Sequence, residues 1–246
     1  SSLKSQFTLL KGNSPVWLLT LAFVAWGFMN GGMTFKMYYF TYYVGDQLMF
    51  ANLNTITPIF AAVGTFSLNY LVTKVKNKAT IPAWMFTLYA IVSIACYFLP
   101  MRELGADGGS SAKLIYYIIG GAIPGFCTGA ILGSLYGMVP DTAEYTMYKY
   151  NQYAGGFLST VVNFFFKLGQ AIAIAAAAWV LEGIGYVPNA AQTKNVLWHM
   201  NFWTHIFVAI CYVIAAIAMF MYKLDKETYA KMAAEIVARR DAAEQQ

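Results

Sequence analysis

Two lysines within long apolar stretches are the residues of this chain best placed to do chemistry. Lys36 and Lys167 each interrupt a stretch that otherwise carries no charge. A charged side chain deep in a membrane is costly, so it usually faces the interior of a helix bundle or a water-filled cavity. We therefore expect the two ammonium groups to meet a polar ligand. The alternatives are neutralisation by a neighbouring helix and, for Lys36, a side chain that extends outward to the membrane surface.

A stripe of polar and small residues surrounds Lys167. Its members recur at spacings of three and four, which places them on one face of a helix. They are Gly156, Thr160, Asn163, Lys167 and Gln170. The opposite face is apolar and consists of Val161, Phe164, Phe165 and Leu168. We expect the stripe to line a cavity that holds a polar ligand, and the candidate substrate-binding residues on it are Thr160, Asn163, Lys167 and Gln170.

The first long stretch combines glycines and aromatic side chains around Lys36. Near its centre stands the string NGG at residues 30–32, which predicts a locally weakened helix, as in transporter helices that bend around a site. Beyond Lys36, the string YYFTYY at residues 38–43 is dense in aromatic rings that carry hydroxyl groups. Such rings form belts at membrane interfaces, and they also stack on sugar rings. We take Tyr39 as a candidate sugar-binding residue, with an interfacial belt as the alternative.

Motifs for catalysis, metal binding or phosphate binding do not occur in the sequence. His199 and His205 are six residues apart, which places them on different faces of a helix, so we expect satisfied packing residues and no shared metal site. The three cysteines lie inside apolar stretches and indicate no disulfide framework or zinc site. No glycine-rich phosphate loop and no nucleophile elbow is present. The sequence predicts no enzyme, no metal site and no cofactor.

The distribution of charges predicts six membrane-spanning helices. The chain has 246 residues, of which 59% are hydrophobic and 11% charged, whereas a soluble domain has roughly 25% charged residues. Six apolar stretches reach the length of about 20 residues that a bilayer requires; they cover residues 16–44, 48–73, 80–101, 114–139, 153–181 and 196–222. We expect an all-α membrane protein in which residues 16–222 form one six-helix bundle. Residues 1–15 precede the bundle, and residues 223–246 form a cytoplasmic C-terminal helix or tail.

Basic residues predict the orientation of the bundle in the membrane. With the N-terminus inside, the inner segments hold eleven Lys and Arg residues and the outer loops hold three, which is a strong positive-inside bias. We therefore expect both termini in the cytoplasm, and we assign the net charge of +5 to contact with membrane lipid, not nucleic acid. All eleven acidic residues fall in loops or at helix ends, so the chain offers no obvious intramembrane site for a cation.

A row of glycines marks the fourth stretch. Gly121, Gly125, Gly129, Gly133 and Gly137 recur every four residues. Small residues at this spacing let helix backbones approach closely. Because each step of four residues advances about 40° beyond a full turn, the row spirals around its helix. We expect it to contact more than one neighbouring helix.

Four local strings resemble a known family of membrane proteins. In chain order they are YYFTYYVGD at residues 38–46, DTAEY at residues 141–145, the fifth stretch with Lys167, and IGYVPN at residues 184–189. Together they resemble the C-terminal half of the glycoside–pentoside–hexuronide–cation symporters, the melibiose permease family within the major facilitator superfamily. The resemblance covers nearly the whole chain. It implies a twelve-helix fold of two six-helix bundles in which this chain supplies helices 7–12, and residues 1–15 are the remnant of the central cytoplasmic loop.

The resemblance also implies roles for individual residues. Lys167 matches the lysine of the eleventh helix that lines the sugar and cation cavity of the family, and Asn163 matches a sugar-facing polar position. Asp141 and Glu144 match an acidic loop whose salt bridges gate the cytoplasmic side. The chain departs from melibiose permeases in two places, because Val162 replaces a glutamine and Gly129 replaces a tryptophan. These departures disfavour melibiose itself as the substrate.

The function implied by the resemblance is sugar transport. We expect the C-terminal half of a secondary active transporter that carries a glycoside, pentoside or hexuronide together with Na⁺ or H⁺ by alternating access. The coupling cation is expected to bind mainly to the N-terminal six-helix bundle, a partner of this chain in a bacterial cytoplasmic (inner) membrane. Two alternatives stay open: an autonomous six-helix homodimer that acts as a sugar uniporter or pore, and a non-transporting membrane assembly partner. A hexuronide is of interest because its carboxylate would neutralise Lys36.

Overall fold

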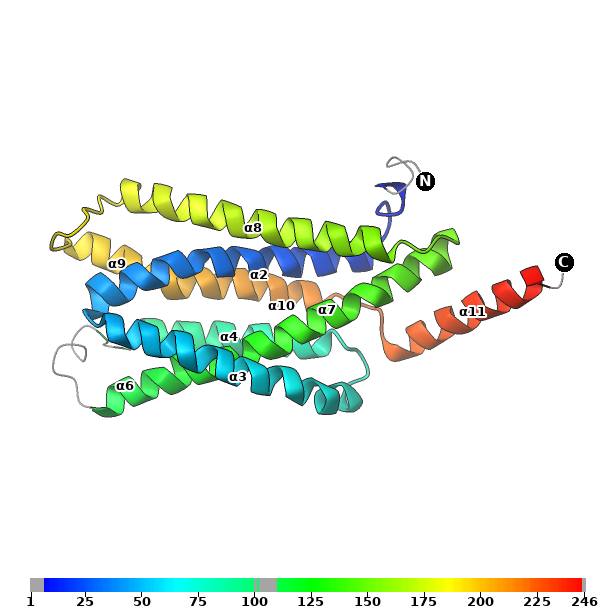
Figure 1. Ribbon diagram of the computed structural model, residues 1–246, viewed down its shortest axis with the longest axis horizontal. Coiled ribbons are helices and arrows are strands. Elements are labelled where there is room, and N and C mark those ends of the chain that lie inside the picture. Colours follow the sequence, from blue (N-terminus) through cyan, green and yellow to red (C-terminus); the bar gives the residue numbers. More distant parts are fainter. Residues whose placement is uncertain (1–6, 100, 102–109, 245–246) are drawn as a thin grey trace.

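The computed structural model describes residues 7–99, 101 and 110–244, and this part of the chain is built from helices and their connections. Six helical stretches within it are long and apolar enough to cross a membrane. The start of the first stretch and the helix that follows the last lie at the same end of the molecule (Figure 1). The prediction of an all-α membrane protein with six spans is confirmed.

The six spans are made of eleven helical segments within the described residues, and three of these segments are π-helical. The first span consists of α2 (Ser14–Tyr38) and the π-helical η1 (Tyr39–Val44). The second and third are α3 (Gln47–Lys74) and α4 (Thr80–Phe98). The fourth consists of α6 (Ser110–Tyr117), the π-helical η2 (Ile118–Ala122) and α7 (Ile123–Tyr150). The fifth is α8 (Gly155–Gly183), and the sixth consists of α9 (Lys194–Phe202), the π-helical η3 (Trp203–Phe207) and α10 (Val208–Phe220). A further helix, α11 (Lys226–Glu244), follows the bundle.

Local sequence sets the points at which the first two spans begin. The side chain of Asn13 caps α2 by accepting a hydrogen bond from the backbone N–H of Val16 at 3.2 Å, and Pro15 occupies the first turn. Asp46 caps α3 in the same way, since its Oδ1 accepts a hydrogen bond from the N–H of Met49 at 3.0 Å. A short polar side chain before the first turn satisfies backbone donors that have no partner within the helix.

The fourth span extends further than its apolar stretch. That stretch ends at Val139, but α7 continues as a helix to Tyr150 and ends at Asn151, which adopts a left-handed backbone conformation with a φ of 53°. Asp141 and Glu144 therefore lie on α7, and the acidic loop that the sequence led us to expect there does not form. The physical reason is that charge marks the point at which a helix leaves the bilayer core, whereas a helix ends only where its backbone conformation changes.

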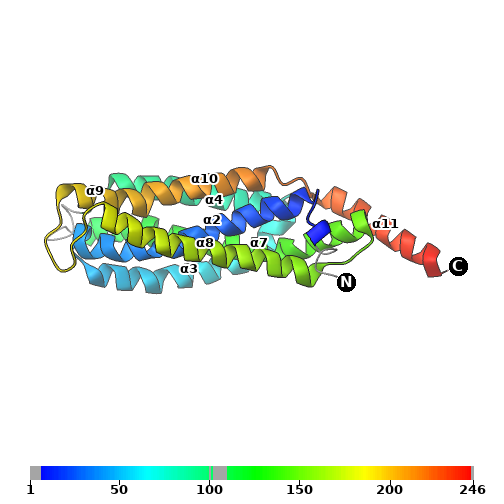
Figure 2. The same ribbon diagram turned by 90° about the horizontal axis from the view of Figure 1, so that it is seen from above.

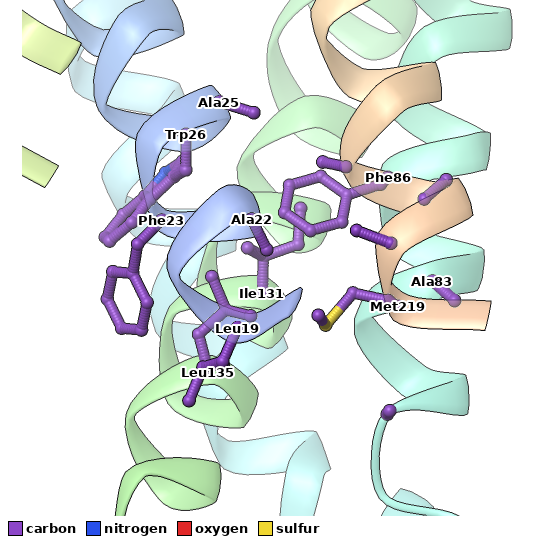
Figure 3. Close-up of a cluster of buried hydrophobic side chains, with 14 of the residues drawn as sticks. Leu19, Ala22, Phe23, Ala25, Trp26, Ala83, Phe86, Ile131, Leu135 and Met219 are labelled. Atoms are coloured by element: carbon purple, nitrogen blue, oxygen red, sulfur yellow. The ribbon is translucent and has the colours of Figure 1, made fainter. Parts of the chain in front are cut away.

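The centre of the bundle is formed by α2, α4, α7 and α10, whose apolar side chains pack together (Figure 3). Leu19 and Phe23 of α2, Phe86 of α4 and Ile131 of α7 are fully buried there. In the four spans that contain these helices, 44–56% of the residues in the most apolar part are buried. The corresponding share is 11% for α3 and 22% for α8. The two remaining helices therefore lie at the rim.

The rim helices leave one side of the bundle uncovered. Figures 1 and 2 show α4 and α10 together on one side of the bundle and α3 on the opposite side. At the rim, α8 packs on α2 and α3 packs on α7. We call the side opposite α4 and α10 the open face; it is formed by α3, α8 and the parts of α2 and α7 between them.

Glycines join α8 closely to α2. A Cβ atom added at Gly27 would collide with the carbonyl oxygen of Phe166, and one added at Gly31 would collide with the carbonyl oxygen of Gln170. Only a residue without a side chain permits this approach of two backbones. The contacts also fix the relative height of the helices, since the neighbours of Lys167 lie level with the middle of α2.

The glycine row of α7 joins α7 to α3. A Cβ atom added at Gly121, Gly125, Gly129 or Gly133 would meet α3 in every case, whereas Gly137 has nothing within 4 Å. The prediction of close packing is confirmed, and the prediction of more than one partner helix is wrong. A single helix follows the spiral of the row because α3 crosses α7 obliquely (Figure 1).

Candidate functional site

The polar stripe of α8 is exposed in the middle of the helix. The side chains of Thr160, Asn163 and Lys167 are exposed, and Gln170 is half-buried. Lys167 Nζ lies 3.5 Å from Gln170 Oε1. The hydroxyl of Thr160 donates a hydrogen bond to the carbonyl oxygen of Gly156 at 2.9 Å. The structure thus brings four of the predicted site residues onto one surface, with the Lys167 ammonium at its centre. Among the described residues, no carboxylate forms a hydrogen bond with this ammonium.

An aromatic wall from α2 and α7 adjoins the stripe. The hydroxyl of Tyr136 on α7 donates a hydrogen bond to Asn163 Oδ1 at 2.9 Å. The ring of Trp26 on α2 packs against Phe166 with centroids 4.8 Å apart and against Tyr136 at 6.5 Å. Lys167 Nζ lies 5.4 Å from the centroid of the Phe166 ring. Sequence analysis missed Tyr136 and Trp26, although Tyr136 stands between two glycines of the row, where a large polar side chain is exceptional.

Lys36 lies at a different site, in a cavity of about 100 Å³ inside the bundle. Residues from α2, α3, α4, the fourth span and the sixth span line the cavity. Lys36 follows Gly27 by nine residues, which corresponds to about 13 Å along the helix axis at about 1.5 Å per residue. Because Gly27 is level with Phe166, the neighbour of Lys167, the two lysines lie at different levels of the bundle.

His205 forms a buried hydrogen-bond network at the wall of this cavity. Its Nδ1 lies 3.1 Å from the carbonyl oxygen and 2.9 Å from the side-chain oxygen of Asn201, and its Nε2 lies 3.0 Å from the hydroxyl of Tyr116. Asn201 itself donates through Nδ2 to the carbonyl oxygen of Tyr97 at 3.1 Å. These partners assign the proton to Nδ1, with Nε2 accepting from Tyr116. His205 is therefore a satisfied packing residue, as predicted, whereas the buried Nδ1 of His199 makes no hydrogen bond with a described residue and departs from that prediction.

Tyr39 is fully buried behind Lys36 and away from the polar stripe. Its ring meets the imidazole of His205 edge to face at 4.8 Å and stacks on Tyr43 at 5.0 Å. Its hydroxyl has no hydrogen-bond partner among the described residues. The structure thus places Tyr39 and Lys36 together at one end of the bundle and the α8 stripe nearer its middle.

The two candidate gating residues pair within this bundle. Lys78 Nζ, from the α3–α4 connection, lies 2.9 Å from both carboxylate oxygens of Asp141. The ammonium also lies 5.3 Å from the ring of Tyr229 on α11. Burial raises the pKa of Tyr229, and the hydroxyl's hydrogen bond to Glu144 raises it further. Asp141 therefore joins α7 to the α3–α4 connection, and Glu144 joins it to α11.

A second ion pair connects helices at the opposite end. Lys113 Nζ, at the start of the fourth span, lies 2.7 Å from Asp46 Oδ2 in the connection that precedes α3. The hydrogen bond from Lys113 holds the pKa of Asp46 below its usual value of 3.8, and the hydrogen bond from the backbone of Met49 acts in the same direction. The ion pair links the connection between η1 and α3 to the start of the fourth span.

The fold and the exposed polar stripe define a polytopic membrane protein of the transporter class. The family of MFS/sugar transport proteins matches residues 2–226. The chain belongs to this family, whose members are transporters and not enzymes.

Curated relatives match the chain over most of its length. It is 25% identical over 244 residues to a protein of Escherichia coli (strain K12) described as a 2,3-dihydroxypropane-1-sulfonate exporter. The matched region covers 98% of this chain and 50% of the relative. It is 28% identical over 229 residues to the isoprimeverose transporter of Lactiplantibacillus pentosus, covering 91% and 45%. A protein of Escherichia coli (strain K12) described as a sulfoquinovose importer is 25% identical over 243 residues, covering 98% and 50%. The chain thus spans about half the length of these relatives.

Proposed function

We propose that the chain is the C-terminal half of a secondary active transporter that carries a sugar by alternating access, in symport with Na⁺ or H⁺. The observation that carries this proposal is the open face, where an exposed polar stripe with a central lysine lies on a surface of membrane-spanning helices. Lipid is a poor environment for such a stripe. An N-terminal six-helix bundle that covers the open face would enclose the stripe in a central cavity.

The exposed side chains of the stripe are suited to a sugar. Lys167 supplies hydrogen-bond donors, the amide of Asn163 keeps one N–H beside the one that it donates to the carbonyl of Ser159, and the hydroxyl of Thr160, whose proton is donated to Gly156, supplies an acceptor. The ring of Tyr136, which is 39% exposed beside Asn163, adds an apolar surface of the kind on which a sugar ring packs. Relatives are described as carriers of a sugar or a sulfonate, and in this proposal the substrate of the present chain is a glycoside, pentoside or hexuronide.

The coupling cation belongs to the partner bundle in this proposal. None of the described residues of the stripe is acidic, and oxygen-rich carboxylate sites are what Na⁺ or H⁺ requires inside a membrane. The orientation follows from the basic residues: the end of the bundle that carries α11 and the start of α2 faces the cytoplasm of a bacterial inner membrane. Asp141 and Glu144 then lie on the cytoplasmic side, where they gate access.

Sugar uptake by proteoliposomes tests the proposal. The complete transporter should accumulate sugar against a gradient when a sodium or proton gradient is imposed, and Lys167→Gln should abolish accumulation while Lys194→Gln, at an exposed lysine outside the stripe, should leave it unchanged. The present chain alone should accumulate nothing. Uphill, cation-driven uptake by this polypeptide alone would contradict the half-transporter proposal and favour a homodimer.

A further inference from the structure

The cavity around Lys36 has the composition of an anion site. Polar groups reach it from separate helices, and the ammonium of Lys36 is the only charged group among the described residues that line it. The other polar side chains of the lining are Asn30, Thr57, Ser93, Thr128 and Thr204, together with two tyrosines and His205. Hydroxyl and amide groups can donate hydrogen bonds to an anion, and an ammonium group has three donors and no acceptor.

Lys36 has no counter-ion within the described part of the chain. It makes no ion pair there; the ion pairs within the described bundle join Asp46 to Lys113 and Asp141 to Lys78. His205 cannot neutralise it, because an imidazole is neutral or positively charged, and both of its nitrogens are hydrogen-bonded to Asn201 and Tyr116. Lys36 is half-buried, and a partly desolvated charge without a partner is unfavourable, so the cavity favours a ligand of opposite charge.

A second observation points to a ligand at the same place. Thr204 is 8% exposed, lines the cavity, and its hydroxyl has no hydrogen-bond partner among the described residues. Buried hydroxyl groups are normally hydrogen-bonded. An anion held by Lys36 would give the Thr204 hydroxyl an acceptor and would satisfy both groups at once.

The size and the entrance of the cavity restrict the ligand to a small group on a larger molecule. Its volume of about 100 Å³ is about a third or less of an ordinary small-molecule pocket of about 300–1,000 Å³. Met33, which lines the cavity, is 38% exposed on α2, so the cavity reaches the surface there. Gln170 of the stripe is level with Gly31, and Lys36 lies five residues, or about 8 Å, further along the axis of α2.

We propose that the Lys36 cavity is an anion subsite that binds the singly charged acidic group, a carboxylate or sulfonate, of a sugar whose uncharged part lies at the Gln170 end of the α8 stripe. This inference rests on the proposed sugar transport and names its substrate class. Lys36 supplies the charge, and Thr204 and Ser93 supply hydrogen bonds. The polar stripe alone does not distinguish an acidic sugar from its neutral counterpart, whereas the cavity does.

Binding of matched sugars to the complete transporter tests the subsite. Calorimetric titrations would compare methyl glucuronide with methyl glucoside, and galacturonide with galactoside, in the wild type, Lys36→Gln, Lys36→Arg and the control Lys194→Gln. The acidic member of a pair should bind at least tenfold more tightly to the wild type. Lys36→Gln should weaken the acidic sugar about ten- to a hundredfold, the range of a hydrogen bond to a charged group, and should change the neutral sugar less than twofold.

The controls separate the outcomes. Lys36→Arg should retain most of the preference for the acidic sugar, and Lys194→Gln should retain all of it; equal unfolding midpoints confirm that the variants are folded. Equal losses for both sugars in Lys36→Gln, or no preference in the wild type, would overturn the subsite. Binding of sodium chloride that Lys36→Gln abolishes, without any preference between sugars, would assign the cavity to a free anion and overturn the substrate class. Failure of the wild type to transport any sugar speaks against the proposed function, whereas transport that is indifferent to Lys36 speaks against the subsite alone.

Discussion

The ammonium of Lys78 is shared equally between the two carboxylate oxygens of Asp141, each at a distance of 2.9 Å. The carboxylate is 8% exposed and the lysine side chain 36% exposed. The pair joins the α3–α4 connection to α7 at the end of the bundle that carries α11. The residues that the sequence suggested as a gate are thus held within one bundle, where they set the position of one helix end against another.

Removal of this pair should loosen the gate. Asp141→Ala should lower the free energy of unfolding by about 1.5–3 kcal/mol, the contribution of a hydrogen bond to a charged group, measured by thermal unfolding in detergent.

In the complete transporter, neutralising Asp141 and Glu144 together should increase the labelling of cysteine probes on the inner side of the cavity. The exchanged pair Lys78→Asp with Asp141→Lys should restore part of the loss. Unchanged labelling would argue against a gating role.

Tyr136 should contribute to sugar binding through Asn163. Tyr136→Phe removes the hydroxyl that orients the amide, which should weaken sugar binding to the complete transporter by about two- to tenfold, since a neutral hydrogen bond contributes about 0.5–1.5 kcal/mol. Tyr70→Phe is the matched control, because Tyr70 is 65% exposed on the rim helix α3. Equal effects of the two substitutions in a binding titration would show that the hydrogen bond does not matter.

The contact between α3 and α7 should tolerate no side chain at Gly129. Gly129→Ala places a Cβ atom against the backbone of Ala61, and overpacking of this kind costs about 1–3 kcal/mol. Gly137→Ala, on the same helix, has open space around it and should stabilise by up to about 1 kcal/mol, because alanine has the higher helix propensity. Thermal unfolding of both variants would measure the difference, and a reversed order would refute the packing argument.

Acid should weaken the connection between Asp46 and Lys113. Because the pKa of Asp46 lies below its usual value of 3.8 in the folded protein, its contribution to stability is complete above about pH 5 and declines as the pH falls through the lowered pKa. The contribution of a partly exposed pair is about 0.2–1 kcal/mol. Unfolding midpoints measured from pH 7 to pH 3 should fall less steeply for Asp46→Asn than for the wild type. Parallel curves would show that the pair does not stabilise the fold.

The sequence predicts the spans well because the cost of burying charge decides them. Polar residues at helical spacing likewise predict the common face of Asn163 and Lys167. The separation of Lys36 from Lys167 depends on the relative height of α2 and α8. Glycine contacts between these two helices fix that height, and the helices are distant in the sequence. The burial of Tyr39 depends on the π-helical segment η1, which begins at Tyr39. The spacing of polar and apolar residues in the sequence does not predict a π-helical segment. Tyr136 joins the site only because α7 passes beside α8.

Two of the three π-helical segments line the Lys36 cavity, through Gly120 of η2 and through Thr204 and His205 of η3, and the third, η1, begins three residues after Lys36. A π turn closes each hydrogen-bonded ring with one residue more than an α turn. Each segment therefore holds one residue more than an α-helical turn, and deleting one residue there would leave a continuous α-helix. Such a deletion between Asn201 and His205 would shorten their spacing from four residues to three and disrupt the hydrogen bonds between them. Some homologous chains should have the cavity and others should lack it. We expect single-residue gaps at the three π-helical segments to distinguish the two groups better than substitutions of lining residues do.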